Sequence, residues 1–252
     1  MTVLEVRDVY KNFGGVKALE GVSLKIDEGE VVGLIGPNGS GKTTLFNVVV
    51  GFYPIDKGDI YFDGSRITGL KPYQTARKGI GRTFQITRVF PRMTVLENML
   101  VAPKDQLGED LFSTFLRWGE VKERERDMVR KAEEILKFLE IDALKDEFAG
   151  NLSGGQRKLL ELGRVLMTDP KMILLDEPVA GVNPTLANKI FDRILELRDE
   201  KGLTFLIVEH NMDVVMGACE RIYVMNKGRI VAEGSPEEIQ SDERVIEAYL
   251  GG

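Results

Sequence analysis

Residues Gly36 to Thr43 read GPNGSGKT, and residues Leu152 to Gln156 read LSGGQ. The first segment fits the G-x-x-x-x-G-K-[ST] pattern, in which glycines let successive backbone N–H groups turn inward around phosphate oxygens. The second segment opens a predicted helix, where a serine hydroxyl and exposed N–H groups lie at the positive end of the helix dipole. The chain therefore contains two predicted phosphate-binding helix starts.

The first segment lies in the context that a phosphate-binding loop requires. Val31 to Ile35 (VVGLI) is an apolar run typical of a buried strand, and a helical pattern begins near Lys42, directly after the glycines. In such a loop Lys42 reaches the terminal phosphates of a nucleotide, and Thr43 holds Mg²⁺. The residues expected to contact the nucleotide here are Gly36, Pro37, Asn38, Gly39, Ser40, Gly41, Lys42, Thr43 and Thr44.

Apolar patterns elsewhere predict an α/β protein. Residues alternate between apolar and polar from Leu4 to Val9 and from Val22 to Ile26, which predicts half-buried strands in an antiparallel sheet. Met172 to Leu175 and Phe205 to Val208 are apolar runs typical of buried parallel strands. The predicted fold is a P-loop nucleoside-triphosphatase core with a mostly parallel sheet, an antiparallel β subdomain and an inserted helical lobe.

Turn and cap residues mark the ends of further elements. Asn183 can cap a helix between the two buried strands, and Gly202 can end that helix. The remaining predicted elements are a hairpin over Gly58 to Ile67 with Asp63-Gly64 at its turn, a strand pair over Arg221 to Met225 and Arg229 to Glu233, and a helical tail that starts at Ser235-Pro236.

Strand patterns disappear between about Phe84 and Leu166, where helical patterns take over. We therefore expect a single domain, in which residues 1–84 and 167–252 form the nucleotide-binding core with the β subdomain. Residues from about 85 to 166 form the inserted helical lobe that carries LSGGQ. One amphipathic helix of this lobe has charged neighbours, which indicate a solvated face, and its apolar residues are Val121, Met128, Ala132, Ile135 and Leu139.

The composition limits the partners of the chain. Its formal net charge of -6 gives no general attraction to nucleic acid, so no nucleic-acid partner is expected. The single cysteine, Cys219, excludes an intrachain disulfide, and we expect a buried structural thiol. No stretch approaches the ~20 apolar residues of a membrane span, so any membrane role requires a separate partner.

Two carboxylates follow the apolar run from Met172, which reads MILLDE up to Glu177. Asp176 is placed to hold Mg²⁺ through its water shell, and Glu177 is placed to orient or deprotonate an attacking water. The alternative is a pair that only caps a neighbouring helix. The presence of Lys42 and Thr43 in the same chain favours the catalytic interpretation.

His210 is the only histidine of the chain, and it follows the apolar run that ends at Val208. A lone histidine is more often structural, but the carboxyl ends of parallel strands face the ligand crevice, where an imidazole could contact a γ-phosphate. Gln85 has an amide that could contact Mg²⁺ or the attacking water. By itself, its sequence context fits a surface glutamine.

In this order the segments resemble the ATP-binding-cassette (ABC) ATPases, and the resemblance spans nearly the whole chain. It implies ATP as the nucleotide, Mg²⁺ as the metal, and Gln85 as a sensor between ATP and a transmembrane partner. It also makes Glu177 the catalytic carboxylate and His210 the γ-phosphate switch. Phe13 becomes the aromatic residue that stacks on adenine, although packing into the core fits Phe13 equally well.

The resemblance further predicts a pocket shared between two chains. LSGGQ lies in the helical lobe, too far along the fold to close on the nucleotide of its own chain, so we expect a head-to-tail dimer that sandwiches two ATP molecules. The family offers an aspartate in the loop after the Asp-Glu strand, whereas this chain has Asn183 and lacks that charge. The expected trans contacts come from Leu152, Ser153, Gly154, Gly155 and Gln156.

Four short runs are similar to the ATPase subunits of branched-chain amino-acid uptake systems, which implies import. Such a subunit works at the cytoplasmic face of the cell membrane, beneath two permease subunits that an extracytoplasmic solute-binding protein loads. An exporter ATPase for lipid or lipopolysaccharide shares nearly every motif, and a soluble cassette protein acting on ribosomes or DNA is a further alternative. The four runs are GIGRTFQ (Gly79 to Gln85), MTVLEN (Met93 to Asn98), AGVNP (Ala180 to Pro184) and VIEAYLG (Val245 to Gly251).

Overall fold

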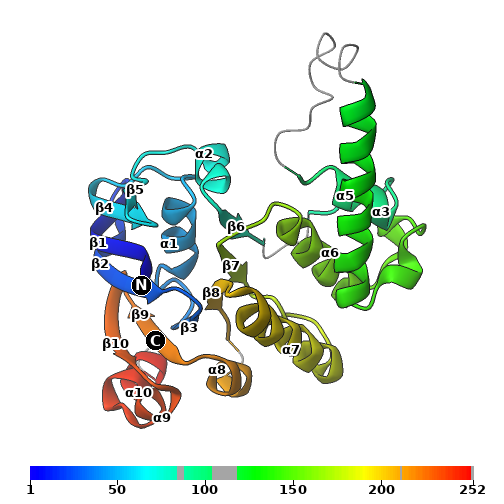
Figure 1. Cartoon of the computed structure of the whole chain (residues 1–252). Coiled ribbons are helices and arrows are strands. Elements are labelled where there is room, and N and C mark those ends of the chain that lie inside the picture. Colours follow the sequence, from blue (N-terminus) through cyan, green and yellow to red (C-terminus); the bar gives the residue numbers. More distant parts are fainter. Residues whose placement is uncertain (84–87, 104–117, 211, 251–252) are drawn as a thin grey trace. The chain divides into compact units, whose positions relative to one another are not determined.

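The computed structural model describes residues 1–83, 88–103, 118–210 and 212–250 (Figure 1). Contacts divide the chain into two compact units. Unit 1 contains Met1–Gln85, Pro170–Ala180 and Ala187–Gly252, and unit 2 contains Ile86–Asp169 and Gly181–Leu186. The two predicted phosphate-binding segments therefore belong to different units.

Unit 1 contains a four-stranded antiparallel sheet in the order β2-β1-β4-β5. The antiparallel strand pair predicted from the alternating residues is confirmed, and both strands extend beyond the predicted stretches. At the predicted hairpin turn Asp63 and Gly64 have φ of 49° and 68°, the positive values that a tight two-residue hairpin turn requires. The strands are β1 (Thr2–Phe13), β2 (Val16–Asp27), β4 (Lys57–Phe62) and β5 (Ser65–Arg66).

The second sheet of unit 1 has six strands in the order β10-β9-β3-β8-β7-β6. Neighbouring strands are parallel except at the β9–β10 edge, which confirms the mostly parallel sheet and the predicted strand pair. Sequence patterns did not predict β6, because three residues that include a glycine and an arginine show no periodicity. The strands are β3 (Val31–Ile35), β6 (Ile80–Arg82), β7 (Met172–Asp176), β8 (Thr204–Val208), β9 (Arg221–Asn226) and β10 (Arg229–Gly234).

One apolar core joins the two sheets of unit 1 around α1 (Lys42–Val49), which Figure 1 shows beside both sheets. Leu45 and Phe46 of α1 are fully buried in this core, because only one side of the helix is apolar. Tyr223 crosses between the sheets: its hydroxyl donates to the Lys25 carbonyl at 3.0 Å and accepts from the Lys25 N–H at 3.2 Å. Residues of α1 and β3 therefore belong to the same core.

Helix ends in unit 1 follow the predicted cap residues. Asn183 Oδ1 accepts the Leu186 N–H at 3.0 Å at the start of α7 (Pro184–Lys201), which begins in unit 2 and continues in unit 1. Gly202 ends α7 with φ of 64°, and Ser235 caps α9. The other helices of unit 1 are α2 (Pro72–Arg77), α8 (Met212–Ala218), α9 (Pro236–Ser241) and α10 (Glu243–Leu250).

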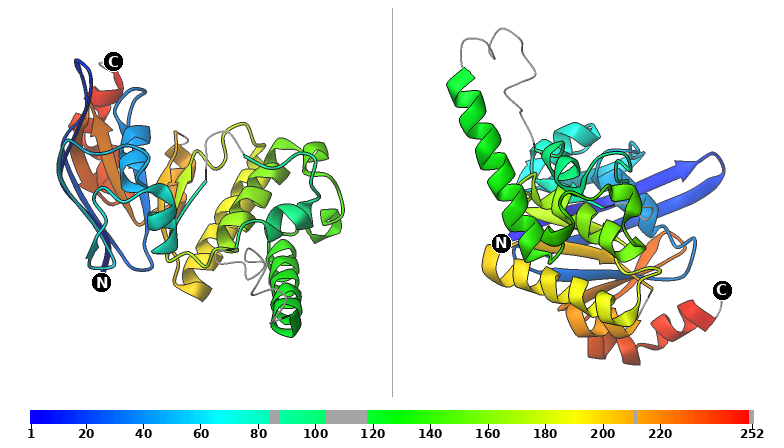
Figure 2. Two further views of the ribbon diagram at one scale, coloured as in Figure 1. Left: turned by 90° about the horizontal axis from the view of Figure 1, so that it is seen from above. Right: turned by 90° about the vertical axis from the view of Figure 1, so that its right-hand side faces the viewer.

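The elements assigned in unit 2 are helical. The helices α3 (Val95–Leu100), α5 (Trp118–Phe138) and α6 (Gly154–Leu166) pack together (Figure 2), with short 3₁₀ turns at Asp142–Leu144 and Ala149–Asn151. Ala132 and Ile135 of α5 are buried while most of the described charged residues of this helix are exposed, as the amphipathic pattern predicts. Within the described ranges, no helix has both the length and the apolar character that crossing a membrane requires.

Candidate functional site

The candidate site lies at one edge of the six-stranded sheet in unit 1. The loop from Gly36 follows β3, Glu177 follows β7, and His210 follows β8, and these three strands are adjacent and parallel. The carboxyl ends of adjacent parallel strands meet at the same edge of a sheet. The topology therefore brings together residues that lie up to about 170 positions apart in the sequence.

Two glycines of the loop are required by the backbone around them. Gly36 has φ of 145°, and a Cβ atom there would lie 2.1 Å from the Met225 carbonyl oxygen. Gly41 has φ of 108°, and its Cβ would lie 2.6 Å from the Ala18 carbonyl oxygen. Between them Asn38 and Gly39 are exposed, so the middle of the loop is open to a ligand.

Lys42 is held across the loop that precedes it. Its Nζ donates to the carbonyls of Gly36 at 2.7 Å and Pro37 at 3.0 Å, with Ser40 Oγ 3.4 Å away. Burial lowers the pKa of Lys42, and the nearby carboxylates of Glu177 and Asp176 partly oppose this shift. An ammonium group beside glycine-lined backbone fits a polyphosphate, which would add further negative charge.

Asp176 is buried at the end of β7 and paired with Arg82 of β6. Arg82 Nη2 lies 3.2 Å from Asp176 Oδ2, and Arg82 Nη1 donates to Asn47 Oδ1 of α1 at 2.7 Å. Burial raises the pKa of Asp176, and Arg82 opposes the shift because it stabilises the carboxylate. Arg82 connects three elements of the site, although no sequence pattern singled it out.

Glu177 and His210 meet side chain to side chain, with Glu177 Oε1 3.1 Å from His210 Nε2. Glu177 has φ of 50°, a left-handed conformation that is uncommon outside glycine and marks a constrained turn after β7. The side chain of His210 is 41% exposed, which excludes a buried structural role for this histidine. The structure therefore pairs the side chain predicted to act on the attacking water with the side chain predicted to contact the γ-phosphate.

Phe13, at the end of β1, is 43% exposed, which argues against packing into the core. Its ring contacts the Tyr53 ring edge-on, with centroids 5.2 Å apart, and Lys11 Nζ lies 5.1 Å from the Phe13 centroid. An exposed aromatic ring can stack on a nucleobase, and adenine stacking remains a prediction for Phe13.

Gln85 lies outside the described residues.

LSGGQ lies at the start of α6 in unit 2, where the side chains of Ser153 and Gln156 each accept the backbone N–H of the other residue. Ser153 Oγ accepts the Gln156 N–H at 3.3 Å, and Gln156 Oε1 accepts the Ser153 N–H at 2.9 Å. Leu152 is only 3% exposed, which makes its side chain an internal anchor. A Cβ on Gly155 would lie 2.1 Å from Leu186 Cδ2, whereas Gly154 has open space around it. Ser153 and Gly154 are the exposed members of the motif.

Mg²⁺ fits this site only together with a nucleotide. Among the described residues, no group of three or more His, Cys, Asp or Glu side chains could hold a metal ion. Mg²⁺ is usually bound by one or two carboxylates and by substrate phosphates. The exposed Thr43 hydroxyl and the Asp176 carboxylate match this limited set of protein donors.

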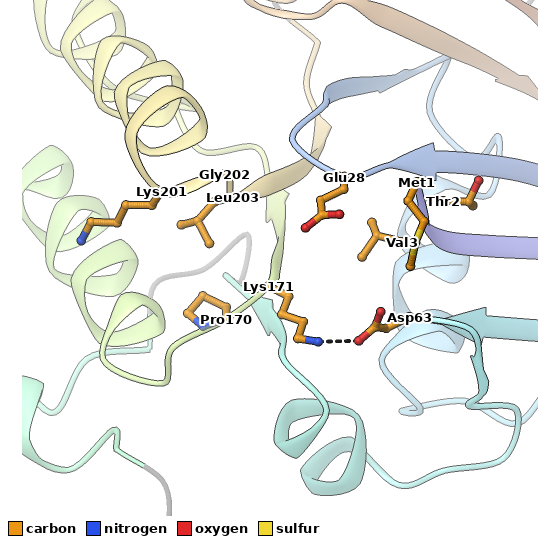
Figure 3. Close-up of a pocket in the computed structure, with 10 residues that line it drawn as sticks. All are labelled: Met1, Thr2, Val3, Glu28, Asp63, Pro170, Lys171, Lys201, Gly202 and Leu203. Carbon is orange, nitrogen blue, oxygen red and sulfur yellow. Dashed lines mark hydrogen bonds and ion pairs between the residues drawn. The ribbon is translucent and has the colours of Figure 1, made fainter.

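A separate pocket of about 210 Å³ lies before β7 and β8, at the ends opposite to the candidate site (Figure 3). Pro170 and Lys171 precede β7, while Gly202 and Leu203 precede β8. Lys171 is ion-paired with Asp63 across this pocket, and both side chains are exposed. The pocket shares no residue with the candidate site.

The strand–loop–helix unit, the Asp-Glu strand end and the histidine at one sheet edge define a P-loop nucleotide-binding protein. The family model described as ABC transporter matches residues 19–180. The chain therefore belongs to the ABC transporter family and is an ATPase of that family. A second model, described as branched-chain amino acid ATP-binding cassette transporter, matches residues 229–252.

Relatives match the chain along its whole length. The "Probable branched-chain amino acid transport ATP-binding protein LivG" of Archaeoglobus fulgidus is 47% identical over 100% of this chain and 96% of its own. The protein of the same name from Methanocaldococcus jannaschii is 48% identical, over 100% and 98%. The "High-affinity branched-chain amino acid transport ATP-binding protein BraF" of Pseudomonas aeruginosa is 41% identical, over 99% and 98%.

Solved structures match the same fold. A nucleotide-free ATP-binding cassette from an ABC transporter gives a TM-score of 0.87 at 47% identity, covering 100% of both chains. An ADP conformation of such a cassette gives 0.86 at 45% identity, also covering 100% of both chains. A dimeric cassette in a post-hydrolysis state with ADP and Pi gives 0.77 at 27% identity, covering 92% of this chain and 98% of the other.

Proposed function

We propose that the chain is the ATP-hydrolysing subunit of a membrane transporter that energises the import of branched-chain amino acids. The observation that carries this proposal is full-length similarity to branched-chain amino acid transport ATP-binding proteins, joined by the separate match of residues 229–252. The relatives described above are named for branched-chain amino acid transport and not for lipid or lipopolysaccharide export. The whole chain acts as one ATPase domain, with the segment from about 85 to 166 as an inserted helical lobe.

Each side chain at the sheet edge has a task in hydrolysis. Lys42 binds the terminal phosphates, and Thr43, Asp176 and Gln85 would hold Mg²⁺, which neutralises phosphate charge when bound. Glu177 orients the attacking water and accepts its proton at a carboxylate oxygen as the bond to the leaving ADP breaks. His210 contacts the γ-phosphate and holds Glu177 through their 3.1 Å contact. Phe13 stacks on adenine.

The pocket is completed by a second ATPase subunit in head-to-tail order, either another copy or a related chain. Ser153, Gly154 and the Gly155 N–H of one chain contact the nucleotide that Lys42 holds in the other. Two observations support this arrangement. Ser153 and Gly154 are exposed, and structures of related cassettes have been solved as dimers. Hydrolysis removes the phosphate that bridges the two chains, and the dimer then opens.

The transporter partners are two transmembrane permease subunits at the cytoplasmic face of the membrane, with an extracytoplasmic solute-binding protein acting through them. Unit 2 offers exposed aromatic residues for a protein partner. Phe90 and Phe148 are 47% and 53% exposed, on neighbouring loops joined by the Gly150 N–H to Pro91 carbonyl bond of 3.0 Å. Exposed apolar side chains close together are typical of protein interaction sites.

The test is reconstitution of the chain with candidate permeases in lipid vesicles. A binding protein loaded with leucine, isoleucine or valine should stimulate ATP turnover, and labelled amino acid should enter the vesicles. A Glu177→Gln version of the same complex controls for leakage. Stimulation by lipopolysaccharide instead, or co-sedimentation with ribosomes without permease binding, would reject import and support the corresponding alternative.

A further inference from the structure

Glu209 is a buried carboxylate that precedes His210 in the sequence and bonds to the loop that follows Glu177. It follows β8, is 3% exposed, and belongs to unit 1 together with both of these residues. Its Oε1 accepts the Val179 N–H at 3.0 Å, and its Oε2 accepts the His210 N–H at 3.1 Å. One side chain therefore joins the backbone after β7 to the backbone after β8.

The Val179 bond crosses from the loop after β8 to the loop after β7, while the His210 bond joins sequence neighbours and fixes the Glu209 side chain. Val179 lies two residues after Glu177, and its N–H is the next backbone donor because Pro178 has none. The Glu177 N–H donates to the Val208 carbonyl at 2.9 Å, so the two strand ends are also tied before the turn. Glu209 therefore links the two loops through its bond to Val179, and the Glu177–His210 contact links them a second time.

The geometry requires two acceptors at this position. A carboxylate accepts at both oxygens, whereas a glutamine of the same shape offers one acceptor and one N–H₂ donor. In a Glu209→Gln protein, the NH₂ group would face one of these two backbone N–H groups, and that donor would lose its partner in Glu209.

We propose that Glu209 is a positioning residue that sets His210 against Glu177 by holding the two loops at a fixed separation. The proposal rests on the hydrolytic roles of Glu177 and His210 given above. Both Glu209 oxygens accept backbone N–H groups, so the proposal assigns Glu209 no contact with the nucleotide or the attacking water. Its loss should therefore lower kcat and leave ATP binding by the P-loop nearly unchanged.

The sole histidine of the chain makes the test direct, because ¹³C-labelled histidine gives a single His210 ring signal in NMR spectra. In the otherwise natural protein, Glu177→Gln should move this signal, since the two side chains touch. In the Glu209→Gln protein, the same Glu177→Gln change should move it by less than half as much. The kcat of Glu209→Gln should fall about 10- to 100-fold, the size expected when a reacting group is misplaced by about 1 Å, with KM within about twofold.

Glu220→Gln is the matched control, because it makes the same chemical change at an exposed carboxylate that pairs with Arg198 at 2.6 Å. It should leave the NMR response and kcat at their natural values. If Glu209→Gln fails to fold, Glu209→Asp replaces it, since the shorter carboxylate cannot reach both N–H groups.

Retention of the full NMR response, or of kcat within about twofold of the natural protein, would overturn the positioning role. The NMR comparison uses no ATP. Absence of ATP hydrolysis in the natural protein would therefore reject the proposed function without deciding the role of Glu209.

Discussion

The helix starts of α1 in unit 1 and α6 in unit 2 look alike in sequence but differ in their free hydrogen-bonding groups. At α1 the cap residue is Gly41, which provides no side-chain hydrogen bond, and Lys42 lies over the loop. At α6 Ser153 and Gln156 cap one another. Because uncapped N–H groups need an acceptor from outside the helix, the start of α1 can bind a phosphate without first breaking a side-chain cap.

We infer from this difference in capping that the P-loop and LSGGQ act at different steps of the ATPase cycle. The residues proposed to bind phosphate in the P-loop all lie in unit 1, so one chain should bind nucleotide without help. At α6 an incoming phosphate must compete with an existing cap, so LSGGQ should add little to the first binding event. Its contribution should appear when two chains close on the same nucleotide.

The largest expected effect is on the rate of ATP hydrolysis and leaves phosphate binding at the two helix starts unchanged. Glu177→Gln should lower ATP turnover about 10²- to 10⁴-fold, because the amide cannot accept the proton of the attacking water. ATP affinity, measured by fluorescence titration, should stay within about threefold, because the role proposed for Glu177 involves the attacking water and not phosphate binding. Glu200→Gln on the exposed end of α7 should change neither quantity. Normal turnover by the Glu177→Gln protein would remove Glu177 from the mechanism.

The next effect compares the two helix starts directly. Lys42→Ala should weaken ATP binding by a single chain about 10- to 100-fold, because a charged donor to phosphate is lost. Ser153→Ala should leave that affinity within about twofold and lower turnover by the pair instead. Calorimetric titration at dilutions where the chain is monomeric measures both affinities. Equal losses in the two variants would contradict the division of tasks.

The free energies of unfolding of two glycine variants compare crowding by backbone at Gly36 with crowding by a side chain at Gly155. Gly36→Ala should destabilise the fold by about 3 kcal/mol, because the new methyl group meets the fixed Met225 carbonyl in a left-handed backbone. Gly155→Ala should cost only about 1 kcal/mol, because the Leu186 side chain can move. Urea unfolding provides both values, with Gly154→Ala as a control in open space. A larger cost at Gly155 would show that α6 is the more rigid helix start.

The smallest expected effect concerns Cys219, a buried cysteine of unit 1 that belongs to neither motif. Burial raises the pKa of its thiol to about 12, so the folded chain should contain almost no reactive thiolate at pH 8. Iodoacetamide should therefore leave the native protein unlabelled and modify it only after unfolding. Rapid labelling at pH 8 would show that this part of unit 1 opens readily.

The sequence was sufficient wherever one short pattern determines a structure. The P-loop between β3 and α1, the Asp63-Gly64 hairpin and the α7 cap at Asn183 were predicted because their determinants are local. Arg82 and Glu209 were not predicted as site residues. Arg82 is 94 positions from its partner Asp176, and Glu209 is 30 positions from Val179. The left-handed backbone of Glu177 also has no sequence signal, since tertiary contacts impose it.

The central claim is that each nucleotide pocket combines α1 of one chain with α6 of another, and mixing two inactive variants tests it most directly. In a pair of one Lys42→Ala chain and one Ser153→Ala chain, one pocket carries both defects and the other carries none. An equimolar mixture should recover up to roughly a quarter of the natural ATPase activity, if pairing is random and the pockets act independently. No recovery, with both variants folded and mixed dimers detected by energy transfer, would contradict it.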